Sequence, residues 1–343
     1  MRTLTPRRVA GICGLLGAVL FIVVVISLRM GAYPIAVSDI VKTLVNGALG
    51  RKDQIPSDLA LVIFGLRLPR IALGILVGAS LSTAGAGFQA LLRNPLADPY
   101  VLGVSSGAAL GSILSLILVP HVPGAIQAAA FAGAAATTAA VYFLGRRGGQ
   151  LDSATLLLAG IISASFLSAI IMFLMTTLTG RDLRGMAFWL MGDLATPLPS
   201  THLFAWFGFL FLVFFFAAGA MYTTASDLNL ILTGEQEARH LGVNLNRVKL
   251  VVYVSASVLT GLAVSVSGAI GYVGLLVPHV MRMIFGTDYR LLIPTSVIGG
   301  AIAIVVADLL ARTVVAPTEL PVGAMTAIAG APVFIYLIRR RVR

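Results

Sequence analysis

Few residues in this chain of 343 have types and spacing that could do chemistry. The three lysines, Lys42, Lys52 and Lys249, lie outside any Gly-x-x-x-x-Gly-Lys-Ser/Thr loop, so the chain lacks that kind of nucleotide-binding loop. The four histidines have no pairwise ligand spacing, and one cysteine, Cys13, cannot build a thiolate cluster. We therefore expect neither a metal site nor a catalytic centre within this chain.

One acid, Asp308, falls well inside a long apolar segment. Acids at such positions often serve as proton relays, which would make the protein a proton-coupled secondary transporter. Arg312 follows four residues later on the same helix face, where it can form a local ion pair with Asp308. The spacing favours the ion pair and keeps the relay as an alternative.

Two prolines interrupt the apolar sequence at 94–99, in the stretch Asn94-Pro95-Leu96-Ala97-Asp98-Pro99. Proline lacks a backbone donor and disfavours helix in the residue before it. Non-helical backbone at membrane depth is tolerated only where it is buried in protein or lines a cavity. This break is therefore the first candidate functional site.

The composition places these residues in a membrane protein. Hydrophobic residues make up 58% of the chain and charged residues only 11%, and the mean hydropathy is +0.99. The apolar blocks reach about 18 residues or more, enough to cross a hydrocarbon core of about 30 Å, and they lack the alternation of barrel strands. The net charge of +11 sits largely at helix ends, which indicates membrane topology rather than nucleic-acid binding.

We expect an all-α, polytopic, single transmembrane domain over 1–343. The N-terminal apolar run is too long for a signal peptide and lacks a cleavage site, so it is taken as a retained span. An amphipathic piece at 183–191 suits the membrane surface. Spans two to five and seven to ten resemble an inverted repeat. The ten expected spans are 12–29, 69–92, 100–118, 124–144, 153–178, 203–222, 247–268, 273–286, 293–313 and 321–338.

Ten spans put both termini on one side, together with most of the basic residues, including Arg2 and Arg343. The positive-inside rule assigns this side to the cytoplasm. The segment 223–249 is a loop on the same side, and Thr233 to Gln236 within it fits a helix capping box. Gly242 is expected to end that short helix. The helix could be merely solvated, but it suits contact with a partner.

Long, ordered motifs resemble the FecCD-type permeases, the membrane subunits of type II ABC importers for iron–siderophore complexes, haem and cobalamin. The similarity covers nearly the whole chain after the first span. The motifs include Arg67-Leu68-Pro69-Arg70, Gln89 through Pro99, Leu102 through Ala108, Trp189-Leu190-Met191-Gly192, Gly271 through Leu275, Val277-Pro278-His279, Glu319-Leu320-Pro321 and Gly330 through Phe334.

This resemblance implies the type II ABC importer permease fold and an assembly in the bacterial inner membrane. Two copies would form a homodimer, and two cytoplasmic ATPase subunits would hold ATP and Mg and carry out the hydrolysis. A periplasmic binding protein would deliver the ligand. No cofactor is then expected on this chain, whose other contacts would be membrane lipid and not nucleic acid.

The resemblance also implies roles for particular residues. Asn94 and Leu96 match a cytoplasmic gate, and Ser153 with Ala154 matches a second gate, where the family's cobalamin member has Thr-Ser. The ATPase-coupling helix would carry Gly234, Glu235, Glu237, Ala238, Arg239, Leu241 and Gly242.

Arg67, Arg70 and Arg312 map to the outer surface of the second and ninth spans. Arginines at a helix end can simply extend towards the membrane interface. The resemblance instead implies that these three contact acidic residues of the binding protein. For the substrate, haem or another iron chelate is favoured, with cobalamin as the alternative. A proton-coupled secondary transporter and a non-transporting anchor or receptor are the remaining rivals.

Overall fold

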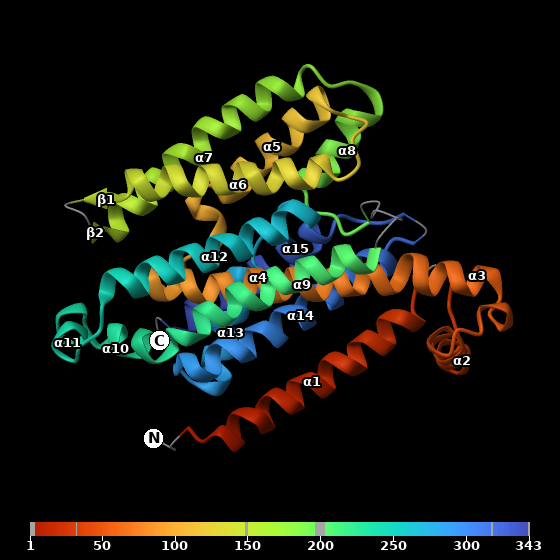
Figure 1. Cartoon of the computed structure of the whole chain (residues 1–343), viewed down its shortest axis with the longest axis horizontal. Helices are drawn as coiled ribbons and strands as arrows, with labels where there is room; N and C mark the ends of the chain where they lie inside the picture. The colour runs from red at the N-terminus through yellow and green to blue at the C-terminus, as the bar shows by residue number, and fades with distance from the viewer. Residues whose placement is uncertain (1–3, 32, 148–149, 196–202, 317, 342–343) are drawn as a thin grey trace.

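The computed structural model describes residues 4–31, 33–147, 150–195, 203–316 and 318–341, so Arg2 and Arg343 lie outside it. Within these ranges ten apolar helices run along the long axis of the molecule (Figure 1), and seven are long enough to cross a membrane. The ten are α1 Pro6–Arg29, α4 Leu68–Leu91, α5 Val104–Leu118, α6 Ala125–Leu144, α7 Ser153–Met175, α9 Leu203–Thr223, α12 Leu245–Ser267, α13 Val273–Phe285, α14 Tyr289–Thr313 and α15 Val322–Arg341. Nine of the ten coincide with the predicted spans to within about six residues, and the second span differs at its start.

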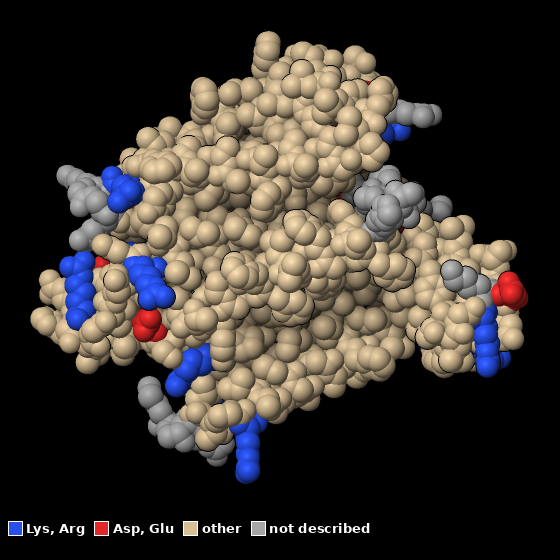
Figure 2. All heavy atoms as spheres, in the orientation of Figure 1, with Lys and Arg blue, Asp and Glu red and all other residues tan. Residues whose placement is uncertain are grey.

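The bundle has two distinct ends. One carries both termini, α10 (Ala225–Thr233), α11 (Glu235–His240) and two short antiparallel strands, β1 (Arg146–Arg147) and β2 (Gln150–Leu151); we call it the termini end (Figure 1). The opposite end carries α2 (Val37–Ala48), α3 (Ser57–Ala60) and α8 (Gly180–Leu190). Charged side chains gather towards the two ends of the face in Figure 2, leaving a broad band of other residues between them. Such a band is expected of a membrane-spanning protein.

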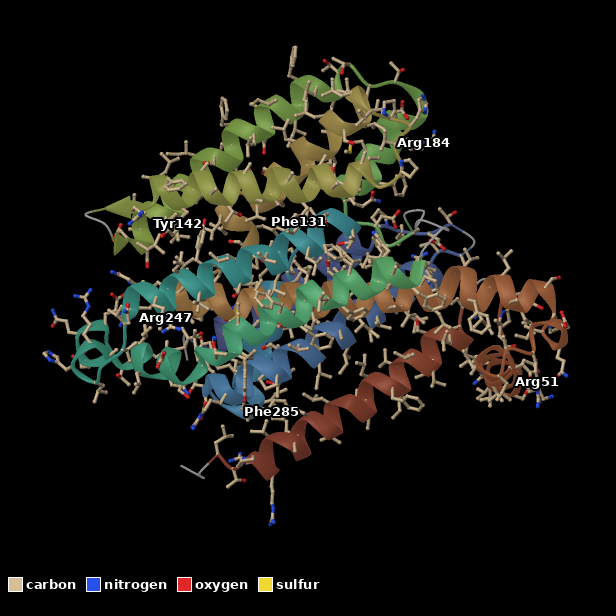
Figure 3. All side chains as sticks on the ribbon, in the orientation of Figure 1. Arg51, Phe131, Tyr142, Arg184, Arg247 and Phe285 are labelled. Atoms are coloured by element: carbon tan, nitrogen blue, oxygen red, sulfur yellow. The ribbon has the colours of Figure 1, made fainter. Side chains whose placement is uncertain are left out.

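Labelled side chains illustrate this separation. Arg247 projects at the termini end, whereas Arg51 and Arg184 project at the opposite end (Figure 3). Phe131 and Tyr142 lie between them on α6. The amphipathic segment predicted at 183–191 is confirmed as a helix, α8, and it lies at the opposite end.

The second span begins earlier than predicted. Its helix starts at Ser57 as α3 and passes through a π-helical segment, η2 (Leu61–Arg67), directly into α4. The amide of Leu68 donates to the carbonyl of Ile63, five residues back. In this wider turn the missing amide of Pro69 does not end the helix, so a start at Pro69 was wrong. The part of the chain between α1 and α3 contains α2 and a short 3₁₀ turn, η1 (Lys52–Gln54).

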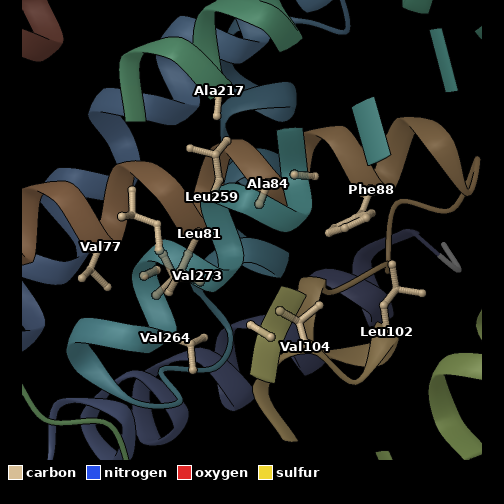
Figure 4. Packing of buried hydrophobic residues seen from close by; sticks show 14 of the residues in the cluster. Val77, Leu81, Ala84, Phe88, Leu102, Val104, Ala217, Leu259, Val264 and Val273 are labelled. Atoms are coloured by element: carbon tan, nitrogen blue, oxygen red, sulfur yellow. The ribbon is translucent and has the colours of Figure 1, made fainter. Parts of the chain in front are cut away.

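Helix α4 lies in the core and packs against α12, α13 and α14. A Cβ atom added at Gly78 would lie 2.1 Å from the carbonyl oxygen of Gly300, and one at Gly85 would lie 1.8 Å from that of Gly274. Small residues let membrane helices approach this closely. Around these contacts Figure 4 shows packed side chains from several helices, among them Val77, Leu81, Ala84, Phe88, Leu259, Val264 and Val273.

Helices α4–α7 and α12–α15 run in opposite senses, because α4 ends at the termini end and α12 begins there (Figure 1). Each quartet has a break before its short second helix. The first break contains the 3₁₀ turn η3 (Pro99–Leu102) and Gly103 at φ 75°, and the second contains Tyr272 at φ 69°. This pattern agrees with the expected inverted repeat.

The loop helix is capped differently from the prediction. Thr233 belongs to the end of α10, where its hydroxyl donates to the carbonyl of Leu230 at 2.8 Å. Gly234, at φ 150°, takes the N-cap position of α11 instead, so the capping box at Thr233 was wrong. The predicted stop at Gly242 is confirmed: its φ is 87°, and the amide of Val243 donates to the carbonyl of Ala238 at 3.0 Å.

Candidate functional site

The break after α4 is a compact turn organised by Asn94. The amide of Asn94 donates to the carbonyl of Gln89 at 3.1 Å, and the Oδ1 atom of Asn94 accepts from the amide of Leu96 at 2.9 Å. The carbonyl of Asn94 accepts from the amide of Ala97 at 3.1 Å. An asparagine that bonds to backbone two residues onward stabilises this kind of turn. Leu96 is left 45% exposed beside it.

The second predicted gate pair lies beside the first. Ser153 starts α7, which Asp152 caps by accepting from the amide of Thr155 at 2.8 Å. The hydroxyl of Ser153 donates to the carbonyl of Leu91 at 3.4 Å, in the last turn of α4. That carbonyl has no partner within its own helix, so Ser153 supplies one. Ala154 is exposed next to it. The two segments therefore come together at the termini end.

A polar hollow of about 440 Å³ lies next to this contact. Its wall combines the end of α4, the start of α7, the start of α11 and the first turns of α12. The Nζ atom of Lys249 lies 2.8 Å from Oε1 of Glu235, so an ion pair joins α11 to α12 on this wall. The lining residues are Leu92, Arg93, Leu151, Asp152, Ser153, Glu235 and Lys249.

Helix α11, which holds the predicted coupling residues, is anchored on one side and open on the other. Ala238 is fully buried, while Glu237, Arg239 and Leu241 are exposed. Gly234 precedes α11 at φ 150°, a backbone conformation that favours glycine, and the carboxylate of Glu237 folds back towards it. A short helix held by one buried alanine and exposed elsewhere offers a surface to a partner.

A charge cluster occupies the opposite end of the bundle. The Nε atom of Arg70 lies 2.7 Å from Oδ1 of Asp308, and the Nε atom of Arg312 lies 3.1 Å from Oδ2. Asp308 is 2% exposed. The predicted Asp308–Arg312 pair is confirmed, and Arg70 is an additional partner that the sequence did not reveal. Both carboxylate oxygens are thus held by guanidinium groups.

Two arginines of this region bind the end of α1. Arg67 donates to the carbonyls of Leu28 and Tyr33. Arg312 donates to the carbonyl and the hydroxyl of Ser27, at 3.2 and 2.7 Å. The last carbonyls of a helix lack partners within it and carry partial negative charge, so cations there are stabilising. These contacts fasten α1 and the residues just after it to η2 and α14.

The expectation that three arginines lie on the surface needs correction. Arg67 is 6% exposed and Arg312 is 7% exposed, because both are turned towards the end of α1. The side chain of Arg70 is 12% exposed and faces Asp308 and Glu319. The docking role of the three remains a prediction, now with Arg70 next to the exposed carboxylate of Glu319.

A hydrogen-bonded link near the turn at Asn94 was not predicted from the sequence. Arg282 of α13 donates to Oε1 of Gln89 at 3.0 Å, and Gln89 donates to the carbonyl of Leu275 at 3.1 Å. Gln89 is 2% exposed. Its signal was present in the sequence, because a buried amide side chain in an apolar helix must find hydrogen-bond partners. The link ties the last turns of α4 to α13.

In the part of the chain that the structure describes, no three His, Cys, Asp or Glu side chains come together in a way that could hold a metal ion.

Ten apolar helices in an inverted repeat with two broken segments are typical of membrane transport proteins. The chain belongs to the FecCD transport family, whose model matches residues 19–340. It is similar to the cobalamin import system permease protein BtuC of Halobacterium salinarum, with 41% identity over 84% of this chain and 76% of that protein. It is 38% identical to the hemin transport system permease protein HmuU of Yersinia pestis, over 95% and 96% of the two chains.

A solved structure described as an inward-facing metal-chelate type ABC transporter has the same fold. The TM-score is 0.80 at 31% identity, over 96% of this chain and 99% of that chain. The protein is therefore a polytopic transport permease of the ABC importer class. This assignment replaces the alternatives of a proton-coupled secondary transporter and a non-transporting anchor or receptor.

Proposed function

We propose that this chain is the membrane subunit of an ATP-driven importer that carries an iron complex, haem or a ferric siderophore, into the bacterial cytoplasm. Two copies form the translocation unit in the inner membrane, and two ATPase subunits bind ATP and Mg. Haem is the first substrate to test: the hemin permease aligns over more of this chain, 95% against 84%, whereas the cobalamin permease is more identical, 41% against 38%. Cobalamin is the alternative substrate.

The observation that carries this proposal is the polar hollow at the termini end. It adjoins the Asn94 turn and the start of α7, and Glu235 of α11 forms part of its wall. A partner that moves α11 would act on α12 through the Glu235–Lys249 pair. The walls of the hollow would then shift beside Asn94, Leu96 and Ser153. Hydrolysis on a separate ATPase would in this way open and close the gate.

We assign the termini end to the cytoplasm. Exposed basic residues such as Arg93, Arg239 and Arg247 lie there together with both chain ends. An excess of arginine and lysine marks the cytoplasmic side of a membrane protein. The opposite end, with Arg67, Arg70 and Arg312, then faces the periplasm, where an acidic surface of a binding protein would dock.

Substrate identity can be tested by ATPase stimulation in proteoliposomes that contain the complete transporter. The partner binding protein is loaded in turn with haem, a ferric siderophore and cobalamin. The proposal predicts the greatest stimulation with haem or the siderophore complex. Stimulation by cobalamin alone would establish the alternative, and no stimulation by any loaded binding protein would contradict the importer assignment.

The docking surface can be tested by charge reversal. In variants that thermal unfolding shows to be folded, Arg70→Glu should weaken binding of the partner protein, and Arg67→Glu combined with it should weaken binding further. Both variants must be compared at low salt, where exposed charges act most strongly. Unchanged affinity at low salt would contradict a docking role for these arginines.

A further inference from the structure

Arg70 holds two carboxylates that differ greatly in burial. Its Nε atom lies 2.7 Å from Asp308, whose side chain is 2% exposed. Its Nη1 atom lies 2.7 Å from Glu319, whose side chain is 48% exposed. The third nitrogen, Nη2, is buried and has no hydrogen-bond partner among the described residues. The guanidinium of Arg70 therefore binds one buried carboxylate and one accessible carboxylate, and it keeps one unpaired donor, Nη2.

The cluster as a whole is short of negative charge. Among the described residues, the three guanidinium groups of Arg67, Arg70 and Arg312 are balanced by two carboxylates, those of Asp308 and Glu319, and Arg67 itself bonds to backbone carbonyls. An acidic side chain from outside is attracted to such a site. Asp308 cannot leave readily because both its oxygens are paired away from water, and breaking a buried pair is costly. Glu319 can, because an ion pair with a half-exposed partner is weak.

Glu319 also occupies a mechanically significant position. It lies in the connection between α14, which ends at Thr313, and α15, which begins at Val322. The neighbouring amide of Leu320 donates to the carbonyl of Ala311 at 3.0 Å, which holds this connection against the end of α14. The Arg70–Glu319 contact adds a tie from the same connection to α4.

The start of α15 is packed against the break that precedes α13. A Cβ atom at Gly323 would lie 2.0 Å from the carbonyl oxygen of Met191 and 2.9 Å from that of Ala269. Further along, a Cβ atom at Gly330 would lie 2.9 Å from the Cβ of Tyr272. A shift at the start of α15 would therefore press on residues 269–272, which lie between α12 and α13. The amide of Ile270 in this segment is held by the hydroxyl of Tyr100 at 3.0 Å, so the segment has few bonds of its own to resist the shift.

We propose that Glu319 is an internal substitute for the partner's carboxylate. When the binding protein docks, one of its acidic side chains takes the place of Glu319 on Arg70, and the freed Glu319 releases the start of α15. Docking would thereby change the packing of α15 against residues 269–272, within the membrane domain. This inference rests on the proposed docking role of Arg70, and it adds a named residue that the docking partner displaces.

The test compares Glu319→Gln with matched losses of charge elsewhere at the same end. Asp53 and Asp58 are exposed acids of the η1 and α3 region, so Asp53→Asn and Asp58→Asn change the net charge equally without touching Arg70. In the complete transporter, Glu319→Gln should raise affinity for the binding protein roughly two- to fivefold, the size expected for a half-exposed ion pair. It should also raise the basal ATPase rate, and the two controls should do neither.

Hydrogen–deuterium exchange supplies a second test on the unmodified protein. Addition of the loaded binding protein should increase exchange in the segment from Thr318 to Gly323. Glu319→Gln should show that increase before any addition. An unchanged or reduced exchange rate on docking would overturn the proposed release.

Comparison with Arg70→Ala separates this inference from the proposed function. If Arg70→Ala weakens docking while Glu319→Gln behaves like the two controls, the proposed displacement of Glu319 is wrong and docking on Arg70 stands. If Arg70→Ala, folded and assembled, binds the partner as well as the unmodified protein does, the docking role of Arg70 is wrong, and the proposed displacement of Glu319 is wrong with it.

Discussion

The two ends of this bundle hold their polar residues in different ways. At the opposite end, Asp308, Arg67 and Arg312 are buried and bonded to one another or to the end of α1. At the termini end, Leu96 and most of α11 are exposed, and one ion pair, Glu235–Lys249, joins α11 to α12. The first region fastens helices together, whereas the second leaves a surface and a hollow for movement.

This difference separates two kinds of functional residue. Breaking a buried charge cluster should damage the fold itself, because unpaired charges remain in a dry environment. Breaking an exposed contact should leave the fold intact and damage only communication with a partner. Stability and activity measurements on the same variants can therefore decide whether the contrast is correct.

The largest expected effect on stability comes from Asp308→Asn. Three guanidiniums would then share only Glu319, and loss of one partner of a buried pair costs about 3–5 kcal/mol. Thermal unfolding in detergent should show a correspondingly large fall in melting temperature. Asp58→Asn, at an exposed acid of the same end, is the control and should change little. Equal melting temperatures for both variants would contradict the anchoring role.

The close contact of α4 with α14 at Gly78 and Gly300, between the two ends, should be the next most sensitive feature. In Gly78→Val the new Cβ would lie 2.1 Å from the backbone of Gly300, so α4 and α14 must separate. Overpacking of a core typically costs about 1–3 kcal/mol. Gly219→Val on α9 is the matched control, since a Cβ there meets nothing within 4 Å. A Gly78→Val variant as stable as this control would show that the close approach of α4 and α14 is unimportant for stability.

At the termini end, Glu235→Lys should abolish ATPase stimulation while changing stability by less than about 1 kcal/mol, because the pair is partly exposed. The charge swap, Glu235→Lys with Lys249→Glu, can re-form the ion pair between α11 and α12. If Glu235 contacts the ATPase, the swap restores no coupling. Full recovery of stimulation by the swap would show that Glu235 acts only by bracing α12.

The smallest effect concerns Asp288, which caps α14 at the termini end. Its hydrogen bonds to Arg290 and to Asn229 of α10 hold the pKa of this carboxylate down to about 2. A lowered pKa stabilises the fold above the unfolded value of 3.8, and this contribution is lost as pH falls towards 2.

Asp288→Asn should therefore flatten the fall in stability between pH 4 and 2 by less than about 1 kcal/mol, since water screens the site. Unfolding followed by tryptophan fluorescence over this pH range would measure the difference. Identical pH profiles for the variant and the unmodified protein would remove the contribution assigned to this cap.

The sequence predicted the local features of both ends and missed the contacts between distant segments. Apolar length located ten spans, with the start of the second misplaced, prolines located the turn at Asn94, and an i, i+4 spacing predicted the Asp308–Arg312 pair. The Arg70–Asp308 bond joins residues 238 positions apart, and no periodicity or spacing can indicate it.

The wrong expectations have local physical causes. The second span was cut at Pro69 because a wider π-helical turn cannot be inferred from residue types alone. The capping box at Thr233 failed because α10 continues through that residue and uses its hydroxyl. Arg67 and Arg312 were placed at the surface because their acceptors are carbonyls of α1, which every residue possesses and no sequence distinguishes.

The central claim is that transport through this permease is driven by ATP on a partner subunit. It is tested most directly by ligand uptake into proteoliposomes that contain the complete transporter, with vanadate or an uncoupler added in separate experiments. The account predicts that vanadate stops uptake and that the uncoupler leaves it unchanged. Uptake that survives vanadate and collapses with the uncoupler would contradict it.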